Sequence, residues 1–115
     1  MIRVAAAALL GAVVLAPQAR PPARVGVVAK EFRFQLSRSS IKAGPAIVEL
    51  DNFGQDAHDL VFQRVGGTHV YSLSETKPHG RTQLHVRLRP GTYRLWCSIA
   101  DHRARGMQAL LRVRR

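Results

Sequence analysis

Residues 89–113, RPGTYRLWCSIADHRARGMQALLRV, predict two strands joined by a polar loop. Apolar and polar residues alternate in TYRLWCS after a Pro-Gly turn signal, and they alternate again in the final stretch ALLRVRR. This two-residue period is typical of strands that bury one face. The residues expected to face inward are Tyr93, Leu95, Cys97, Leu111 and Val113.

The same alternation recurs through most of the preceding chain. Further strands are predicted in KEFRFQLS (30–37), AIVELDN (46–52), HDLVFQRV (58–65), THVYSLS (68–74) and TQLHVRLRPG (82–91). KAGPA (42–46) predicts a turn, and the irregular stretch 67–81 is expected to carry a short helix or a long loop. The expected inward residues are Phe32, Phe34, Leu36, Val48, Leu50, Leu84, Val86 and Leu88. About seven to eight short strands predict an all-β, antiparallel Greek-key β-sandwich.

The N-terminal segment 1–19 has the layout of a secretory signal peptide. One positive charge precedes an apolar run at 4–16, which is shorter than the roughly 20 apolar residues that span a bilayer. We therefore expect cleavage after Ala19, with Ala16 as the second choice, and a mature domain of residues 20–115. Such a chain would be exported to the periplasm or the exterior. A membrane anchor that stays attached is the alternative.

The balance of charge is strongly basic. The whole chain has 18 Lys and Arg residues against 7 Asp and Glu residues, and loss of the signal peptide would remove one basic residue. A surface of this sign is expected to attract anionic partners, such as acidic proteins or an anionic membrane surface in peripheral contact. Nucleic acid is not expected, because the arginines are not interleaved with aromatic residues. We expect a monomer.

The single cysteine, Cys97, cannot form a disulfide within the chain. It is therefore a buried apolar side chain, a site of intermolecular pairing, a nucleophile or a metal ligand. His102 and Met107 follow it at intervals of five residues, and His58 begins an earlier predicted strand. Two imidazoles, a thiolate and a thioether form a donor set that suits copper better than zinc.

Three stretches of the chain resemble the cupredoxins, the small blue copper proteins of the plastocyanin, pseudoazurin and azurin type. The strongest is RPGTYRLWCSIADHRARGMQALLRV, which contains Cys-x4-His-x4-Met between two strands. ELDNFGQDAHDLVF resembles the other half of the family's site, where a strand ends in Asn-x-Gly and a histidine ligand follows. With EFRFQLSRSSIKAG, the resemblance covers residues 24–115.

The resemblance implies a type 1 site with one copper ion and a function in one-electron transfer, without enzymatic turnover of a substrate. It assigns His58, Cys97 and His102 as equatorial ligands and Met107 as the axial ligand. By the same resemblance, Asp59 and Ser98 would join the two ligand-bearing segments through hydrogen bonds and so hold the ligands in place.

The loop between Cys97 and Met107 departs from the family pattern in its charges. Asp101, Arg103 and Arg105 are expected to make a charged rim around the site, where relatives dock redox partners through an apolar patch. We expect the partner to be a redox protein, with an acidic one favoured by the basic charge. His69, His79 and His85 are expected to be ordinary surface histidines.

Three other functions compete with electron transfer. The same ligands would serve a periplasmic or extracellular copper carrier or buffer that delivers copper to another protein. A hydrolase with Cys97 as nucleophile would need a thiolate that substrate can reach, and the cysteine is expected to face inward. A sandwich used only for binding, with an inert cysteine, is the third alternative.

Overall fold

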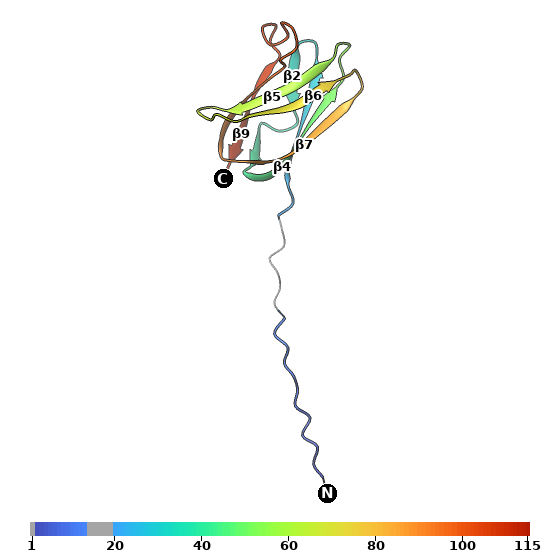
Figure 1. The fold of residues 1–115 in the computed structure, drawn as a ribbon, viewed down its shortest axis with the longest axis vertical. Helices are drawn as coiled ribbons and strands as arrows, with labels where there is room; N and C mark the ends of the chain where they lie inside the picture. The colour runs from blue at the N-terminus through green and yellow to red at the C-terminus, as the bar shows by residue number, and fades with distance from the viewer. Residues whose placement is uncertain (1, 14–19) are drawn as a thin grey trace.

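The computed structural model describes residues 2–13 and 20–115, and in this part of the chain nine β-strands form a sandwich of two sheets (Figure 1). The strands are β1 (Ala23–Lys30), β2 (Arg33–Leu36), β3 (Ser40–Lys42), β4 (Gly44–Asn52), β5 (His58–Arg64), β6 (Val70–Thr76), β7 (Arg81–Leu88), β8 (Gly91–Trp96) and β9 (Gln108–Arg114). The predicted all-β sandwich is therefore confirmed, with more strands than the alternation indicated.

The two sheets are mixed rather than purely antiparallel. One has the order β2-β1-β4-β7 and the other β3-β9-β8-β5-β6. β1 runs parallel to β4, and β3 runs parallel to β9, so the prediction of an antiparallel sandwich is wrong for these two pairs. The reason is the path of the chain: after β1 it makes a hairpin to β2, passes to the other sheet as β3, and returns beside β1 in the same direction.

Two other local predictions are corrected. KEFRFQLS is not one strand, because β1 ends at Lys30 and the chain turns at residues 31–32 before β2 begins at Arg33. The stretch 67–81 carries β6 in place of the expected short helix or long loop, and β6 overlaps the strand predicted in THVYSLS (68–74). β1 was missed because ARVGVVAK has few polar residues to mark an outer face.

The core lies between the two sheets and includes the residues that the alternation places inward, together with Val25, Val27 and Ala29 of β1. Tyr93, Leu95, Cys97, Leu111 and Val113 are all buried, as predicted for β8, β9 and the residue after β8. Leu84 and Val86 of β7 are partly buried and pack against this core. Burying each large apolar side chain contributes about 1.5–3 kcal/mol to folding.

The sandwich begins at Ala23, and the described residues before Arg20 belong to no strand or helix and are exposed. No helix in the described ranges is both long and apolar enough to cross a bilayer. The predicted cleavage points, Ala16 and Ala19, fall within 14–19, outside the described residues. The signal peptide stays a prediction.

Candidate metal centre

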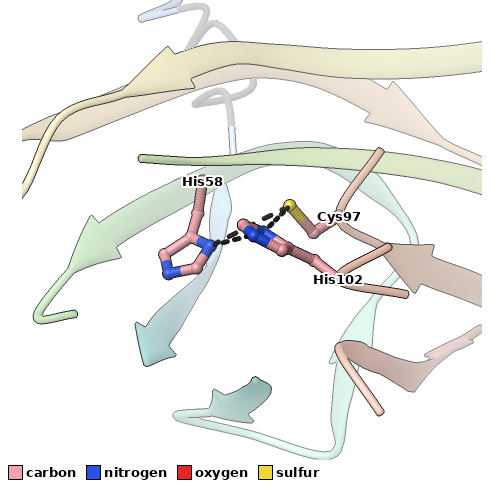
Figure 2. A group of neighbouring side chains, drawn as sticks. All are labelled: His58, Cys97 and His102. Carbon is pink, nitrogen blue, oxygen red and sulfur yellow. Dashed lines mark hydrogen bonds between the residues drawn. The ribbon is translucent and has the colours of Figure 1, made fainter. Parts of the chain in front are cut away.

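Three potential ligands meet at one end of the sandwich (Figure 2). His58 is the first residue of β5, and Cys97 directly follows β8, which is the neighbour of β5 in the sheet. Because these strands are antiparallel, the start of β5 and the end of β8 lie at the same end of the sheet. The turn after Cys97 then carries His102 back toward both residues.

The donor atoms of the three side chains form a small triangle. His58 Nδ1 lies 3.2 Å from His102 Nδ1, and Cys97 Sγ lies 4.0 Å from the first nitrogen and 3.6 Å from the second. Imidazole and thiolate ligands bind a metal at about 2.0–2.3 Å, which separates neighbouring donors by about 3.5 Å. The triangle thus has the size that one ion needs.

The backbone of the turn 97–107 fixes the spacing of its three candidate ligands. The Cys97 amide donates to the Met107 carbonyl oxygen, and the Met107 amide donates to the His102 carbonyl oxygen, each at 3.1 Å. The His102 amide in turn donates to the Ile99 carbonyl oxygen. Cys97, His102 and Met107 are therefore joined by main-chain hydrogen bonds rather than by chain connectivity alone.

All four predicted ligands are shielded from water. His58, Cys97 and Met107 are 0 % exposed and His102 is 7 % exposed. Burial lowers the pKa of His58, with the neighbouring His102 acting in the same direction, and burial raises the pKa of the Cys97 thiol. Neutral imidazole is a ready ligand, whereas the thiol must lose its proton to bind a metal.

Asp59 and Ser98 connect the two ligand-bearing segments. The Ser98 amide donates to Asp59 Oδ1 at 2.7 Å, and the Ser98 hydroxyl donates to Asp59 Oδ2. One carboxylate next to His58 thereby accepts two hydrogen bonds from the residue next to Cys97. This contact restrains the position of β5 relative to the turn that follows β8.

Glu31 is a contributor to the site that the sequence did not reveal. Its carboxylate accepts hydrogen bonds from the Gln55 amide at 2.5 Å and the Asp56 amide at 2.6 Å, and its Oε1 lies 3.6 Å from His58 Nε2. The hydrogen bond from Asp56, together with that from Gln55, lowers the pKa of Glu31 despite an opposing effect of desolvation. A Cβ on Gly54 would lie 2.5 Å from this carboxylate, so a side chain there would displace it.

Asn52 organises the turn that leads into His58. Its side-chain Nδ2 donates to the carbonyl oxygens of Asp56 and Thr76 at 2.8 Å, and its Oδ1 accepts from the Gly54 amide at 2.8 Å. Asn52 is buried, so these three bonds compensate for the loss of water. The Asn-x-Gly pattern in the sequence indicated a turn here, but it did not predict the three hydrogen bonds of the Asn52 side chain.

The rim of the site combines aromatic and charged residues. Phe32 packs against the His102 ring with 4.9 Å between centroids, and the Arg105 guanidinium lies 4.9 Å above the same Phe32 ring. Arg105 also donates to Asp101 Oδ2 at 2.8 Å. Phe32, which the sequence analysis placed in a strand, therefore packs against His102 from the turn between β1 and β2.

The remaining predicted rim residue, Arg103, is exposed and lies 4.5 Å above the ring of Trp96. His69, His79 and His85 are all exposed, and none belongs to the triangle of ligands. Within the described ranges, His58, Cys97 and His102 form the single cluster of His, Cys, Asp and Glu side chains with metal-binding spacing.

Several solved structures of copper proteins have a similar fold. Neither a scan against protein-family models nor a search of curated proteins finds a match. Reduced auracyanin from Roseiflexus castenholzii superposes with a TM-score of 0.66 at 15 % identity, covering 80 % of this chain and 97 % of that one. Auracyanin A, a blue copper protein from Chloroflexus aurantiacus, gives a TM-score of 0.63 at 12 % identity, covering 82 % and 100 %.

Larger copper proteins contain a similar unit. The copper-containing nitrite reductase of Thermus scotoductus gives a TM-score of 0.58 at 21 % identity, covering 90 % of this chain and 25 % of that one. The class defined by these comparisons is the cupredoxin fold. This chain has that fold, as the resemblance of its sequence implies.

Proposed function

We propose that this chain is an exported type 1 copper protein that transfers single electrons. The observation that carries the proposal is the triangle of His58 Nδ1, Cys97 Sγ and His102 Nδ1, which are buried together at one end of a cupredoxin fold. Met107, which is buried and joined to Cys97 and His102 by main-chain hydrogen bonds, is the proposed axial ligand. Bound copper would supply the one-electron Cu(II)/Cu(I) couple.

The burial of the donors favours electron transfer over the alternatives. A carrier must pass its metal to incoming ligands, and side chains that are 0 % exposed leave an acceptor little access. A hydrolase would need an accessible thiolate, whereas Cys97 is buried and burial raises the pKa of its thiol, which disfavours the thiolate. An electron needs no such opening, because it can pass through a nearly buried imidazole.

Rigid support of the ligands suits the same role. Main-chain hydrogen bonds fix the turn, and the Asp59–Ser98 contact joins it to β5. Ligands that cannot move far keep a similar geometry in both oxidation states, so little rearrangement accompanies each transfer. We assign Asp59 and Ser98 this positioning role.

The route to a partner is proposed to run through His102. It is the only one of the four proposed ligands with measurable exposure. Phe32 packs against its ring, and Arg105 lies over Phe32. Asp101, Arg103 and Arg105 would form the docking rim for a redox protein. The molecule is proposed to act as a monomer in the periplasm or outside the cell.

Addition of Cu(II) to the purified protein tests the central assignment. We expect an intense blue colour from thiolate-to-copper charge transfer, and we expect Cys97→Ser to lack it. His85→Ala, on the exposed face of β7, is the matched control and should remain blue. A colourless wild-type protein whose thiol is still alkylated in the presence of copper would overturn the proposal.

A further inference from the structure

The charged residues of this chain are segregated along the strand direction. Five segments lie at the strand ends opposite the ligand triangle: 20–24, 38–46, 64–69, 87–92 and 112–115. We call these segments the basic end. Their basic residues are Arg20, Arg24, Arg38, Lys42, Arg64, Arg87, Arg89, Arg112, Arg114 and Arg115, and they contain no acidic residue.

The register of the sheets brings these segments together. Gly44 pairs with Leu88 in one sheet, and Lys42 pairs with Arg114 and Gly91 with Val113 in the other. In Figure 1, the C-terminus and the start of the sandwich lie at the lower end, while the loop 97–107 lies at the top. The six steps of β5 from His58 to Arg64 span about 20 Å at roughly 3.3 Å per residue.

The basic end carries essentially the whole net charge of the domain. Beyond it, from Val25 onward, the remaining basic residues are Lys30, Arg33, Lys77, Arg81, Arg94, Arg103 and Arg105. These balance the acidic residues of the chain, of which there are 7. The half of the molecule that holds the ligand triangle is therefore neutral, and the excess positive charge lies at the opposite end.

The arginines of the basic end are not neutralised internally. In the described part of the chain, the ion pairs of Lys and Arg involve only Arg81 and Arg105, neither of which belongs to the basic end. A cleft of about 430 Å³ opens there, lined by Arg64, Arg89 and His69 among others. Unpaired cations around an open cleft present donors to anionic groups from outside the chain.

One further feature favours a membrane as the anionic partner. Val65 and Val70, at the tip of the hairpin from β5 to β6, are 46 % and 50 % exposed beside these cations. Apolar residues next to basic ones suit the boundary between the headgroups and the acyl chains of a bilayer.

We infer that the basic end is a docking surface for the anionic headgroups of a phospholipid membrane, and that docking turns the ligand-bearing end toward the aqueous side. The surface needs no metal. Its electrostatic attraction acts within about a Debye length, 8–10 Å at moderate salt, which is shorter than the sandwich. Redox partners would then approach the exposed, neutral end while the basic end stays on the lipid.

Vesicle binding by residues 20–115, which retain the whole sandwich, tests the inference. The protein should sediment with vesicles of phosphatidylcholine mixed with phosphatidylglycerol, but not with phosphatidylcholine alone, and high salt should release it. A triple variant of the basic end, Arg38→Gln, Arg89→Gln and Arg114→Gln, should bind at least about tenfold more weakly. The matched variant Arg33→Gln, Lys77→Gln and Arg94→Gln has the same net charge and should lose less than about threefold.

The orientation is read from Trp96, the single tryptophan, at the ligand-bearing end of β8. Brominated lipids should leave its fluorescence unquenched in the bound protein. Equal losses in the two triple variants, quenching of Trp96, or no binding to anionic vesicles would each overturn the inference; the last result would point to an acidic protein as partner. Because neither measurement uses copper, failure here is distinct from failure of the proposed redox function.

Discussion

Tyr93 shows how one side chain joins the core to the basic end. Its ring is buried and lies 6.3 Å from the centre of the Phe62 ring, while its hydroxyl donates to the Arg89 carbonyl oxygen at 2.9 Å. The hydrogen bond spans the turn between β7 and β8, so a single residue restrains two strands. Desolvation raises the pKa of Tyr93 above its usual value of 10.0.

Tyr93→Phe should lower the free energy of unfolding by about 1 kcal/mol at neutral pH, because the hydrogen bond is lost while the ring is kept. Since the folded-state pKa is raised, the wild type should lose stability as the pH rises above 10, where unfolded tyrosine ionises first. Urea unfolding at neutral and alkaline pH measures both effects. If the two proteins lost stability equally at alkaline pH, Tyr93 would not be the group responsible.

At the scale of elements, the turn from β4 to β5 positions the first proposed ligand. Asn52 ends β4, and its side chain binds the Asp56 and Thr76 carbonyl oxygens and the Gly54 amide before His58 begins β5. The turn thus depends on one amide that both donates and accepts. Nδ2 donates and Oδ1 accepts, whereas an ionised carboxylate of the same shape could only accept.

Asn52→Ala should lower the free energy of unfolding by about 1–3 kcal/mol, because buried partners lose their hydrogen bonds. Asn52→Asp should cost at least as much at neutral pH, although it has nearly the same shape, since a carboxylate oxygen would face the Asp56 and Thr76 carbonyls. Chemical denaturation of both variants measures whether Asn52→Asp loses at least as much stability as Asn52→Ala. Gln55→Ala, exposed in the same turn, is the control and should change stability by less than about 0.5 kcal/mol.

Some strands and site residues could be predicted from the sequence, and others could not. β8 and β9 were predictable because each alternates cleanly between the core and water, and their inward residues are buried as expected. The candidate ligands could be named from spacing and resemblance together. Glu31 could not, because its contacts are with Gln55 and Asp56, and a two-residue period assigns it only to an outer face.

The alternation pattern could not predict the parallel pairing of β1 with β4 or of β3 with β9, for a different reason. Alternation indicates that a segment is a strand, but it carries no information about which neighbour the strand pairs with. β1 and β4 pair over seven residues, from Ala23 with Ala46 to Ala29 with Asn52, only because the chain leaves the sheet between them. That path is a property of the whole sandwich.

At the scale of the whole molecule, the two groups of charged residues are far enough apart to act independently at moderate salt. Arg103 and Arg105 lie at the rim of the proposed site, about 20 Å from the basic end along the strands. At about 0.1 M salt the Debye length is near 10 Å, so charges at the basic end are largely screened from a reagent that approaches His102.

We therefore expect Arg103→Gln with Arg105→Gln to slow electron transfer to the anion ferricyanide at about 0.1 M salt, with the difference disappearing near 1 M. Arg38→Gln with Arg114→Gln removes the same charge from the basic end and should have little effect. Stopped-flow kinetics of the reduced, copper-loaded protein measures the rates. Equal slowing by both pairs would show that net charge, rather than the rim, governs the approach.

A metal bound at the proposed site would also cross-link two distant parts of the chain, β5 and the turn after β8. His58 and His102 are 44 positions apart in the chain, so one ion that holds both would close a large loop. By the chain-entropy relation used for disulfides, closing such a loop removes conformational freedom from the unfolded chain worth about 4 kcal/mol. In a domain with a single cysteine, a bound metal would thereby restrain the chain as a disulfide between paired cysteines does in other small domains.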